Sequence, residues 1–204
     1  MHDAADWRWE IIEDDMPPTA PPLSNVKNVA VFCASADGRD PLYKNAAEEL
    51  GRKLASRGIG LIYGGAKVGL MAAVADAALE HGGHVVGVIP EVLVDLEVAH
   101  QGLSELHVTS TMHTRKEMMG DRADAFVVLP GGFGTFEELF EVLAWQTLKL
   151  HAKPILLLNT LGFYDAMLGF LDHCVVEGML KQKNREIVLV AAGVDEALAM
   201  LGLL

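Results

Sequence analysis

The chain has few cysteines, few aromatic residues and no long apolar run. Its two cysteines, Cys33 and Cys174, lie 141 positions apart, a spacing typical of neither a disulfide framework nor a zinc site. No apolar segment approaches the roughly 18 residues of a membrane-spanning helix. Asp3 and Asp6 precede any apolar stretch, so the N-terminus does not resemble a secretion signal. We therefore expect a cytoplasmic protein with no metal site and no membrane partner.

Basic residues are also scarce in this sequence. Lysine and arginine number 16 against 28 acidic residues, which gives a net charge of −12 over 204 residues. Long-range electrostatics therefore oppose binding to DNA, RNA or anionic membranes. A small anionic ligand could bind only where backbone N–H groups or a few cations converge. We expect a small-molecule partner and no nucleic acid.

Residues 1–24 differ in composition from the remainder. They carry six acidic side chains and one basic side chain, and four of the eight prolines fall between Pro17 and Pro22. Such a proline run favours an extended polyproline conformation and cannot join the interior of a sheet. We predict an N-terminal arm over residues 1–24 and a single domain over residues 25–204. Trp7 and Trp9 leave open whether the arm docks on that domain or on a partner.

From Asn28 onward, apolar runs rich in β-formers alternate with helical patterns. Several runs are continuously apolar, as in Phe126–Leu129, which is typical of parallel strands covered on both faces. The predicted strands are Val29–Cys33, Ile59–Tyr63, His84–Ile89, Leu106–Thr109, Ala125–Leu129, Ile155–Leu158 and Ile187–Val190. The predicted helices are Pro41–Arg57, Gly69–His81, Thr111–Arg122, Thr135–Leu150, Phe163–Val176 and Val194–Leu201. This alternation predicts an α/β fold, a Rossmann-like, doubly wound, mostly parallel sheet of about seven strands with helices on both faces.

In such sheets, ligands bind beyond the carboxyl ends of the strands, near the point where the strand order reverses. Ala34–Gly38 follows the first strand, and its small residues fit either a close approach to a ligand or an ordinary loop. Gly64–Met71 follows the second strand. It has the glycine spacing of a Walker loop without the Lys-Ser/Thr pair, and it lacks a complete G-x-G-x-x-G pattern. An NTPase or a standard dinucleotide enzyme is therefore disfavoured. Gly64 and Gly65 either admit a mononucleotide or simply shape the turn.

The third segment, Pro130–Glu138, joins the most apolar strand to the longest helix. Gly131, Gly132 and Gly134 allow consecutive N–H groups to converge on an anion, and the helix dipole favours it. Thr135 can cap the helix and also donate its hydroxyl to a phosphate. The pattern Thr135-x-x-Glu138 matches a capping box, so Glu138 either caps the helix or lies beside the sugar of a bound nucleotide.

A carboxylate beside a bound phosphate needs a nearby cation. Arg115 and Lys116 can supply one, because they precede the strand that leads to the glycine loop. Arg115, Met119 and Arg122 share a helical face by their spacing. The alternative is a solvated basic pair on an exposed helix.

Taken together, three motifs resemble the LOG ("lonely guy") family from about Val29 to Leu201. They are Tyr63-Gly64-Gly65 with Gly69-Leu70-Met71, Met112-His113-Thr114-Arg115-Lys116, and Pro130-Gly131-Gly132-x-Gly134-Thr135-x-x-Glu138. The resemblance implies a dimer or higher homo-oligomer that needs no cofactor. It implies hydrolysis of the N-glycosidic bond of an N6-substituted adenosine 5′-monophosphate to the free base and ribose 5-phosphate.

The resemblance also implies roles for individual residues. Arg115 and Glu138 would be catalytic. The substrate contacts would come from Lys116, Gly131, Gly132, Gly134, Thr135, Glu137, Glu97, Gly64 and Gly65. The chemistry fits, since a carboxylate can stabilise positive charge on the ribose and position water, and arginine can orient that carboxylate without donating a proton.

The chain departs from the family pattern at Ala34-Ser35-Ala36, at Ala66, at Ala72 and at Ala144–Lys149, which alters the base pocket and a helix expected to face the dimer partner. On that helix, Phe140, Leu143, Trp145 and Leu148 belong either to a dimer interface or to the core. A non-catalytic nucleotide carrier on the same fold remains an alternative. A lysine decarboxylase is a third, but it would need a Schiff-base lysine for pyridoxal phosphate, and no lysine stands out.

Overall fold

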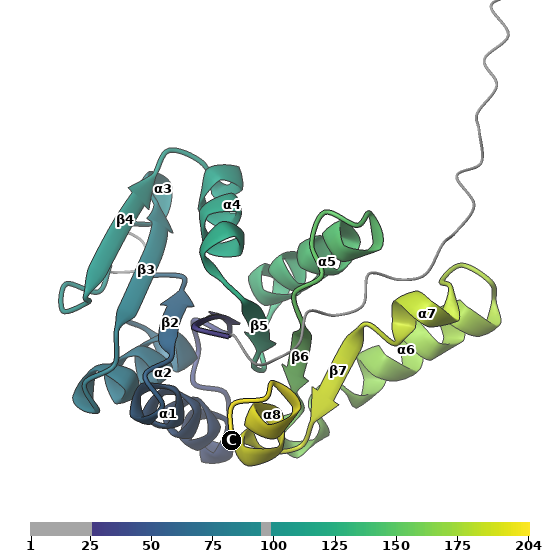
Figure 1. Ribbon diagram of the computed structural model, residues 1–204, viewed down its shortest axis with the longest axis horizontal. Coiled ribbons are helices and arrows are strands. Elements are labelled where there is room, and N and C mark those ends of the chain that lie inside the picture. The colour runs from purple at the N-terminus through teal and green to yellow at the C-terminus, as the bar shows by residue number, and fades with distance from the viewer. Residues whose placement is uncertain (1–25, 95–98) are drawn as a thin grey trace, which may run out of the picture.

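A seven-stranded sheet forms the centre of the molecule (Figure 1), with the strand order β4-β3-β2-β1-β5-β6-β7. The structure, a computed structural model, describes residues 26–94 and 99–204. Every pair of neighbouring strands is parallel. The strands are β1 (Asn28–Phe32), β2 (Gly60–Tyr63), β3 (Val85–Pro90), β4 (Glu105–Thr109), β5 (Ala125–Val128), β6 (Ile155–Leu158) and β7 (Val188–Ala191).

Helices cover both faces of this sheet, because neighbouring residues of a strand point to opposite sides. In β1, Val29 and Val31 pack into one core cluster, and Ala30 and Phe32 pack into the other. The first cluster lies under α1 (Pro41–Ser56), α2 (Gly69–Glu80) and α8 (Val194–Met200). The second lies under α4 (Met112–Arg122), α5 (Phe133–Thr147) and α6 (Asp165–Val176). Three short helical segments complete the described residues, α3 (Glu91–Val94), η2 (Thr160–Gly162) and α7 (Gln182–Arg185).

The predicted fold class is confirmed, and the predicted elements are found in order with small differences. The largest differences in a helix start are two residues: α5 begins at Phe133 and not at Thr135, and α6 begins at Asp165 and not at Phe163. The short helices α3 and α7 carry no periodic apolar pattern and were not predicted. The predicted arm, including Trp7 and Trp9, lies outside the described residues. Among the helices in the described ranges, none combines the length and apolar character of a membrane span.

The strand order reverses between β1 and β5, and this reversal brings two of the predicted loops together. The Ala34 N–H donates to the Pro130 carbonyl over 3.2 Å, and the Leu70 N–H at the start of α2 donates to the Ala36 carbonyl over 3.4 Å. A Cβ at Gly69, which has φ +55°, would lie 2.3 Å from the Ser35 carbonyl carbon. Glycine is therefore required where the first two loops meet. All three post-strand segments therefore lie along the edge of the sheet formed by the carboxyl ends of its strands.

Candidate active site

A cavity of about 340 Å³ opens at this edge, between the loops after β1, β2 and β5. Its volume lies within the range of roughly 300–1,000 Å³ common for small-molecule sites. Polar lining comes from Ser35, Arg115, Thr135 and Glu138. Apolar lining comes from Met71, Leu93, Met112 and Phe133. The cavity thus has a charged part beside the start of α5 and an apolar part formed by α2, α3, α4 and the first residue of α5.

An ion pair between α4 and α5 forms the charged part of the cavity. The Arg115 Nη1 donates to Glu138 Oε1 over 2.6 Å, and both residues are 6% exposed. The Arg115 Nε also donates to the Val88 carbonyl over 3.0 Å, which fixes the guanidinium against the end of β3. Within the described residues, Glu138 Oε2 has no hydrogen-bond partner of its own. The cavity is therefore lined by a carboxylate held at one oxygen by a buried arginine.

This geometry decides two alternatives that the sequence left open. The capping-box interpretation of Thr135 and Glu138 is wrong, because Gly132 is the N-cap of α5 and no side chain caps that helix. Thr135 and Glu138 lie inside the helix, where their side chains are buried. The interpretation of Arg115 as part of a solvated basic pair is also wrong, since its guanidinium is buried in the ion pair. Of the three residues predicted to share a face, Arg115 and Met119 are buried, whereas Arg122 reaches Glu105 over 2.9 Å.

Burial shapes the protonation of the groups around the cavity. Burial raises the pKa of Glu138 above its ordinary value, and the adjacent Arg115 guanidinium opposes this rise without cancelling it. Burial likewise raises the pKa of the Cys33 thiol, which lines the cavity near Glu138, so this thiol is uncharged at neutral pH. The charged form of Glu138 thus depends on Arg115.

The glycines of the motifs divide into two groups. A Cβ at Gly64 would lie 2.7 Å from Arg115 Nη2, and a Cβ at Gly131 would lie 2.1 Å from Thr135 Oγ1. These two glycines leave room for side chains of the protein. At Gly132 and Gly134, by contrast, an added Cβ would meet no atom within 4 Å, and both residues line the cavity. They leave room for a ligand.

The start of α5 has the properties of an anion site. The first N–H groups of a helix have no partner inside the helix, and the helix dipole makes this end positive. Because no side chain caps α5, the N–H groups around Phe133 and Gly134 are available at the cavity. A phosphate at this position would gain both backbone hydrogen bonds and a favourable potential.

Not all of the predicted site residues line this cavity. Gly65, which has φ +79°, and Gly131 shape the loops beside it. Lys116 pairs with Glu137 and, over 2.9 Å, with Glu141, and none of these three side chains lines the cavity. Glu97 lies outside the described residues. Sequence reasoning did not assign Leu93, Met112 and Phe133 to the apolar lining of the cavity. Their positions could have indicated it, because Leu93 follows β3, and Met112 and Phe133 are the first residues of α4 and α5.

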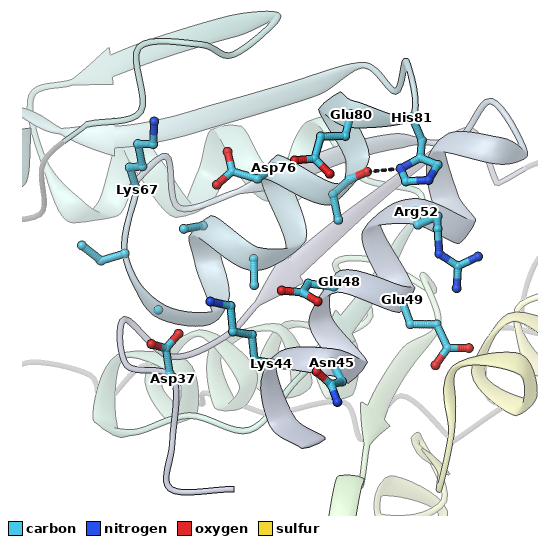
Figure 2. Close-up of a pocket in the computed structure, with 15 residues that line it drawn as sticks. Asp37, Lys44, Asn45, Glu48, Glu49, Arg52, Lys67, Asp76, Glu80 and His81 are labelled. Carbon is cyan, nitrogen blue, oxygen red and sulfur yellow. Dashed lines mark hydrogen bonds between the residues drawn. The ribbon is translucent and has the colours of Figure 1, made fainter. Parts of the chain in front are cut away.

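A larger cavity of about 680 Å³ lies between α1 and α2. Figure 2 shows charged side chains of both signs around it, including Lys44, Glu48 and Arg52 from α1 and Asp76 and Glu80 from α2. Asp76 is half-buried, and the other four side chains are exposed. Mixed, solvated charges do not select one ligand. The smaller cavity, with its buried ion pair and its helix N-terminus, is the better candidate for the active site.

Comparison with known proteins places the chain in a family. The family model described as "Possible lysine decarboxylase" matches residues 71–201. A cytokinin riboside 5′-monophosphate phosphoribohydrolase of Rhodococcoides fascians is 48% identical over 174 residues, which cover 85% of this chain and 88% of that protein. One from Arabidopsis thaliana is 44% identical over 178 residues, which cover 87% and 84%. The chain belongs to the LOG family.

The fold of this LOG-family chain also occurs in proteins named for other functions. The molybdenum cofactor carrier protein of Chlamydomonas reinhardtii is 22% identical, with a TM-score of 0.62, and the match covers 87% of this chain and 97% of that one. At this identity the likeness shows the fold alone. It does not carry a carrier function over to this chain.

The decarboxylase description of the family model does not fit the cavity. A lysine that forms a Schiff base needs a lowered pKa, and no lysine of the described residues lines the cavity. Lys116 is the lysine beside the ion pair. Burial lowers its pKa, but the ion pairs with Glu137 and Glu141 outweigh that effect and leave the pKa raised. The residues present therefore do not suit pyridoxal phosphate chemistry.

Proposed function

We propose that this protein hydrolyses the N-glycosidic bond of N6-substituted adenosine 5′-monophosphates to a cytokinin base and ribose 5-phosphate. The observation that carries the proposal is the buried Arg115–Glu138 ion pair in a cavity that opens at the start of α5. Curated relatives that are 43–48% identical over most of the chain carry the name of this activity.

In this proposal, the phosphate binds at the N-terminus of α5. The N–H groups around Phe133 and Gly134 donate to it, the Thr135 hydroxyl adds a further donor, and Gly132 leaves space for its oxygens. Gly64, Gly65 and Gly131 keep the loops in the shape that this arrangement needs. Because the chain is acidic overall, such local donors have to supply most of the attraction for the phosphate.

Glu138 then faces the sugar. Breaking the bond between C1′ and the base leaves positive charge on the ribose ring, which a nearby carboxylate stabilises. The same carboxylate orients a water molecule whose oxygen forms the new bond to C1′. The electron pair of the broken bond stays with the base, which takes up the proton that the water releases. Arg115 keeps Glu138 ionised and oriented and donates no proton itself.

The apolar part of the cavity would hold the base. Met71, Leu93 and Met112 offer a surface for a flat ring and for an apolar substituent on it. Sequence reasoning assigns a substrate contact to Glu97 as well, and this stays a prediction. It also assigns substrate contacts to Lys116 and Glu137, and these stay predictions too.

A substrate panel tests the proposed activity. The purified protein is incubated with AMP and with isopentenyl-AMP, and the free base is measured by chromatography. We expect release from at least one of them. Glu138→Gln should abolish turnover and leave nucleotide binding largely intact, and Glu177→Gln, at an exposed position after α6, serves as the matched control. No release from any purine or pyrimidine monophosphate would refute the activity, and tight binding without hydrolysis would favour a carrier.

We also propose a cytoplasmic homodimer or higher homo-oligomer. Of the four apolar residues singled out, Leu143 is 9% exposed and belongs to the core, and Trp145 packs against the core. Phe140 on α5 and Leu148 directly after it are 43% and 68% exposed. Exposed apolar side chains on one helix are typical of an interface. The two cysteines are free thiols, which suits a reducing compartment. Light scattering at the monomer mass would contradict the oligomer.

A further inference from the structure

His100 is a buried histidine that the proposed reaction does not use. It is 3% exposed, and both of its ring nitrogens have partners. The Gly102 N–H donates to Nδ1 over 3.0 Å, and Nε2 lies 2.8 Å from Asp76 Oδ1 on α2. Because Nδ1 accepts a hydrogen bond, the ring proton lies on Nε2, which donates it to the Asp76 carboxylate. The His100 side chain thus joins the segment before β4 to α2.

The main chain at His100 holds the turn that follows β2. The His100 N–H donates to the Gly65 carbonyl over 2.9 Å, and Ala99 forms an antiparallel bridge with Ala66. The Ala99 N–H also donates to the Val94 carbonyl at the end of α3 over 3.4 Å. The segment that His100 joins to α2 therefore bonds both the glycine turn and the end of α3.

The same glycine turn forms the surface against which Arg115 packs. Gly65 has φ +79°, and a Cβ there would lie 3.2 Å from the Cβ of Ile89, so the turn is packed closely on β3. A Cβ at Gly64 would lie 2.7 Å from Arg115 Nη2. The guanidinium therefore lies directly on the main chain of the turn. A displaced turn would change the direction in which Arg115 reaches Glu138.

We propose that His100 is a positioning residue for the reaction. With Asp76 it holds the turn at Gly64 in place, and this turn holds Arg115 in the orientation that presents Glu138 to the substrate. The inference rests on the proposed function. His100 is not among the residues that line the cavity, so it acts through the turn and not on the substrate.

The geometry excludes a role for His100 as the acid or base of the reaction. Histidine is the side chain that most often transfers protons in enzymes, but a general acid or base has to reach the reacting atoms. Both ring nitrogens of His100 are instead bonded to the protein, one to Gly102 and one to Asp76. An acid or base role would also make every substitution of the histidine comparably harmful, whereas a positioning role tolerates one that keeps the bond to α2.

The surroundings of Asp76 indicate that variants without this bond still fold. The Asp76 side chain is 45% exposed and lines the larger cavity between α1 and α2 (Figure 2). Water can therefore solvate the carboxylate when His100 is removed, and no buried charge is left without a partner. The expected consequence is a less firmly held turn.

Three substitutions of His100 test the inference through kcat and KM on a substrate that the wild type hydrolyses. Glutamine keeps a donor close to the position of Nε2, asparagine keeps only an acceptor close to Nδ1, and alanine keeps neither. The bond to Asp76 spans 24 residues of chain, whereas that to Gly102 spans two, so the donor is the group that matters. We expect kcat to fall about tenfold in His100→Ala and His100→Asn with little change in KM, and His100→Gln to keep most of it. Wild-type kcat in His100→Ala, or equal losses in all three variants, would overturn the inference.

Substitutions of Asp76 test the other end of the bond. Asp76→Ala should lower kcat as His100→Ala does, and Asp76→Asn, which keeps an acceptor, should restore most of it. Combining Asp76→Ala with His100→Ala should add little further loss, because both remove the same interaction. Fully additive losses would overturn the inference.

His151→Ala is the matched control for a general loss of stability. The His151 ring also bonds the main chain through both nitrogens, with Nε2 3.0 Å from the Val142 carbonyl and Nδ1 3.2 Å from the Lys153 nitrogen. It does not line the candidate active site. The unfolding temperature and kcat are measured for both alanine variants. We expect His151→Ala to keep its kcat even where it is as unstable as His100→Ala, and an equal fall in kcat at equal stability would overturn the inference.

A second readout needs no activity. Nitrogen-15 NMR of the ligand-free protein follows the Arg115 Nε–H, which donates to the Val88 carbonyl over 3.0 Å. The inference expects this resonance to shift and to exchange faster with water in His100→Ala, and to return towards its wild-type position in His100→Gln. An unchanged resonance in His100→Ala would overturn it. A wild type that is inactive on every nucleotide would instead refute the proposed function, and the NMR measurement distinguishes that outcome from failure of the inference.

Discussion

Replacing Arg115 by methionine would show how much this arginine stabilises the buried Glu138. Methionine keeps much of the length of the side chain and removes its charge. The carboxylate, 6% exposed, would lose the guanidinium 2.6 Å away. Breaking a buried ion pair from one side costs about 3–5 kcal/mol of folding free energy, because an uncompensated charge remains. We expect a loss of this size at neutral pH, where the carboxylate of Glu138 would otherwise be charged.

The pH dependence of that loss follows from the pKa of Glu138. Burial already raises this pKa in the folded protein, and the substitution raises it further. A folded state that holds the proton more tightly than the unfolded state loses stability as pH rises between the two pKa values. The penalty should therefore shrink towards the ordinary glutamate pKa of 4.5 and grow above it. A smaller part of about 1–3 kcal/mol should persist at every pH, because the Val88 carbonyl also loses its donor.

Urea unfolding, followed by circular dichroism at several pH values, measures both parts. Adding Glu138→Gln to the Arg115→Met variant should remove the pH-dependent part and leave the constant part. A loss that is equal at all pH values, and that Glu138→Gln does not relieve, would refute the electrostatic explanation.

Three further substitutions separate the roles of neighbouring residues. Gly64→Ala should lower kcat/KM by about 10²-fold, because the added Cβ would displace Arg115 Nη2. Misplacing a catalytic group by about 1 Å can reduce the rate by that factor. Gly169→Ala, at an open site on α6, is the neutral control. Gly134→Ala meets no protein atom, so it should preserve stability in thermal unfolding and raise KM about tenfold by occupying the proposed phosphate position. Tyr164→Phe removes the donor to the Leu129 carbonyl at 2.7 Å, just before the glycine loop, and should cost about 1–3 kcal/mol in urea unfolding. Unchanged kinetics or stability in the respective assay would contradict each expectation.

The sheet could be predicted because its central strands are buried on both faces and therefore read as continuous apolar runs. β5 and β6 are fully buried along their lengths, and their continuous apolar sequences alone identify them. β4 at the edge is largely half-buried, and its sequence alternates polar and apolar residues in place of a continuous apolar run. The strand order could be anticipated only as far as the fold class, since the reversal between β1 and β5 depends on pairing across the chain.

The start of α5 was harder to predict for a physical reason. A capping box is a local pattern, and the residue types of Thr135-x-x-Glu138 match it. Glu138 instead bonds Arg115, which is 23 residues away in the chain, and the helix begins two residues earlier at Phe133, after a glycine N-cap. A long-range ion pair between two helices therefore overrode a local preference, and no window of sequence around Glu138 contains that information.

The two pairs of consecutive charged residues carry a signal that helix geometry alone could have revealed. Arg115 and Lys116 are neighbours on one helix, and Glu137 and Glu138 are neighbours on another. Because neighbouring residues on a helix point about 100° apart, at most one side chain of each pair can point directly into a given cavity. Two helices that face one another will therefore sort such pairs into an inner and an outer contact. The outer contact then pairs Lys116 with Glu137 and Glu141, so the acid next to Glu138 in the chain has a cation of its own.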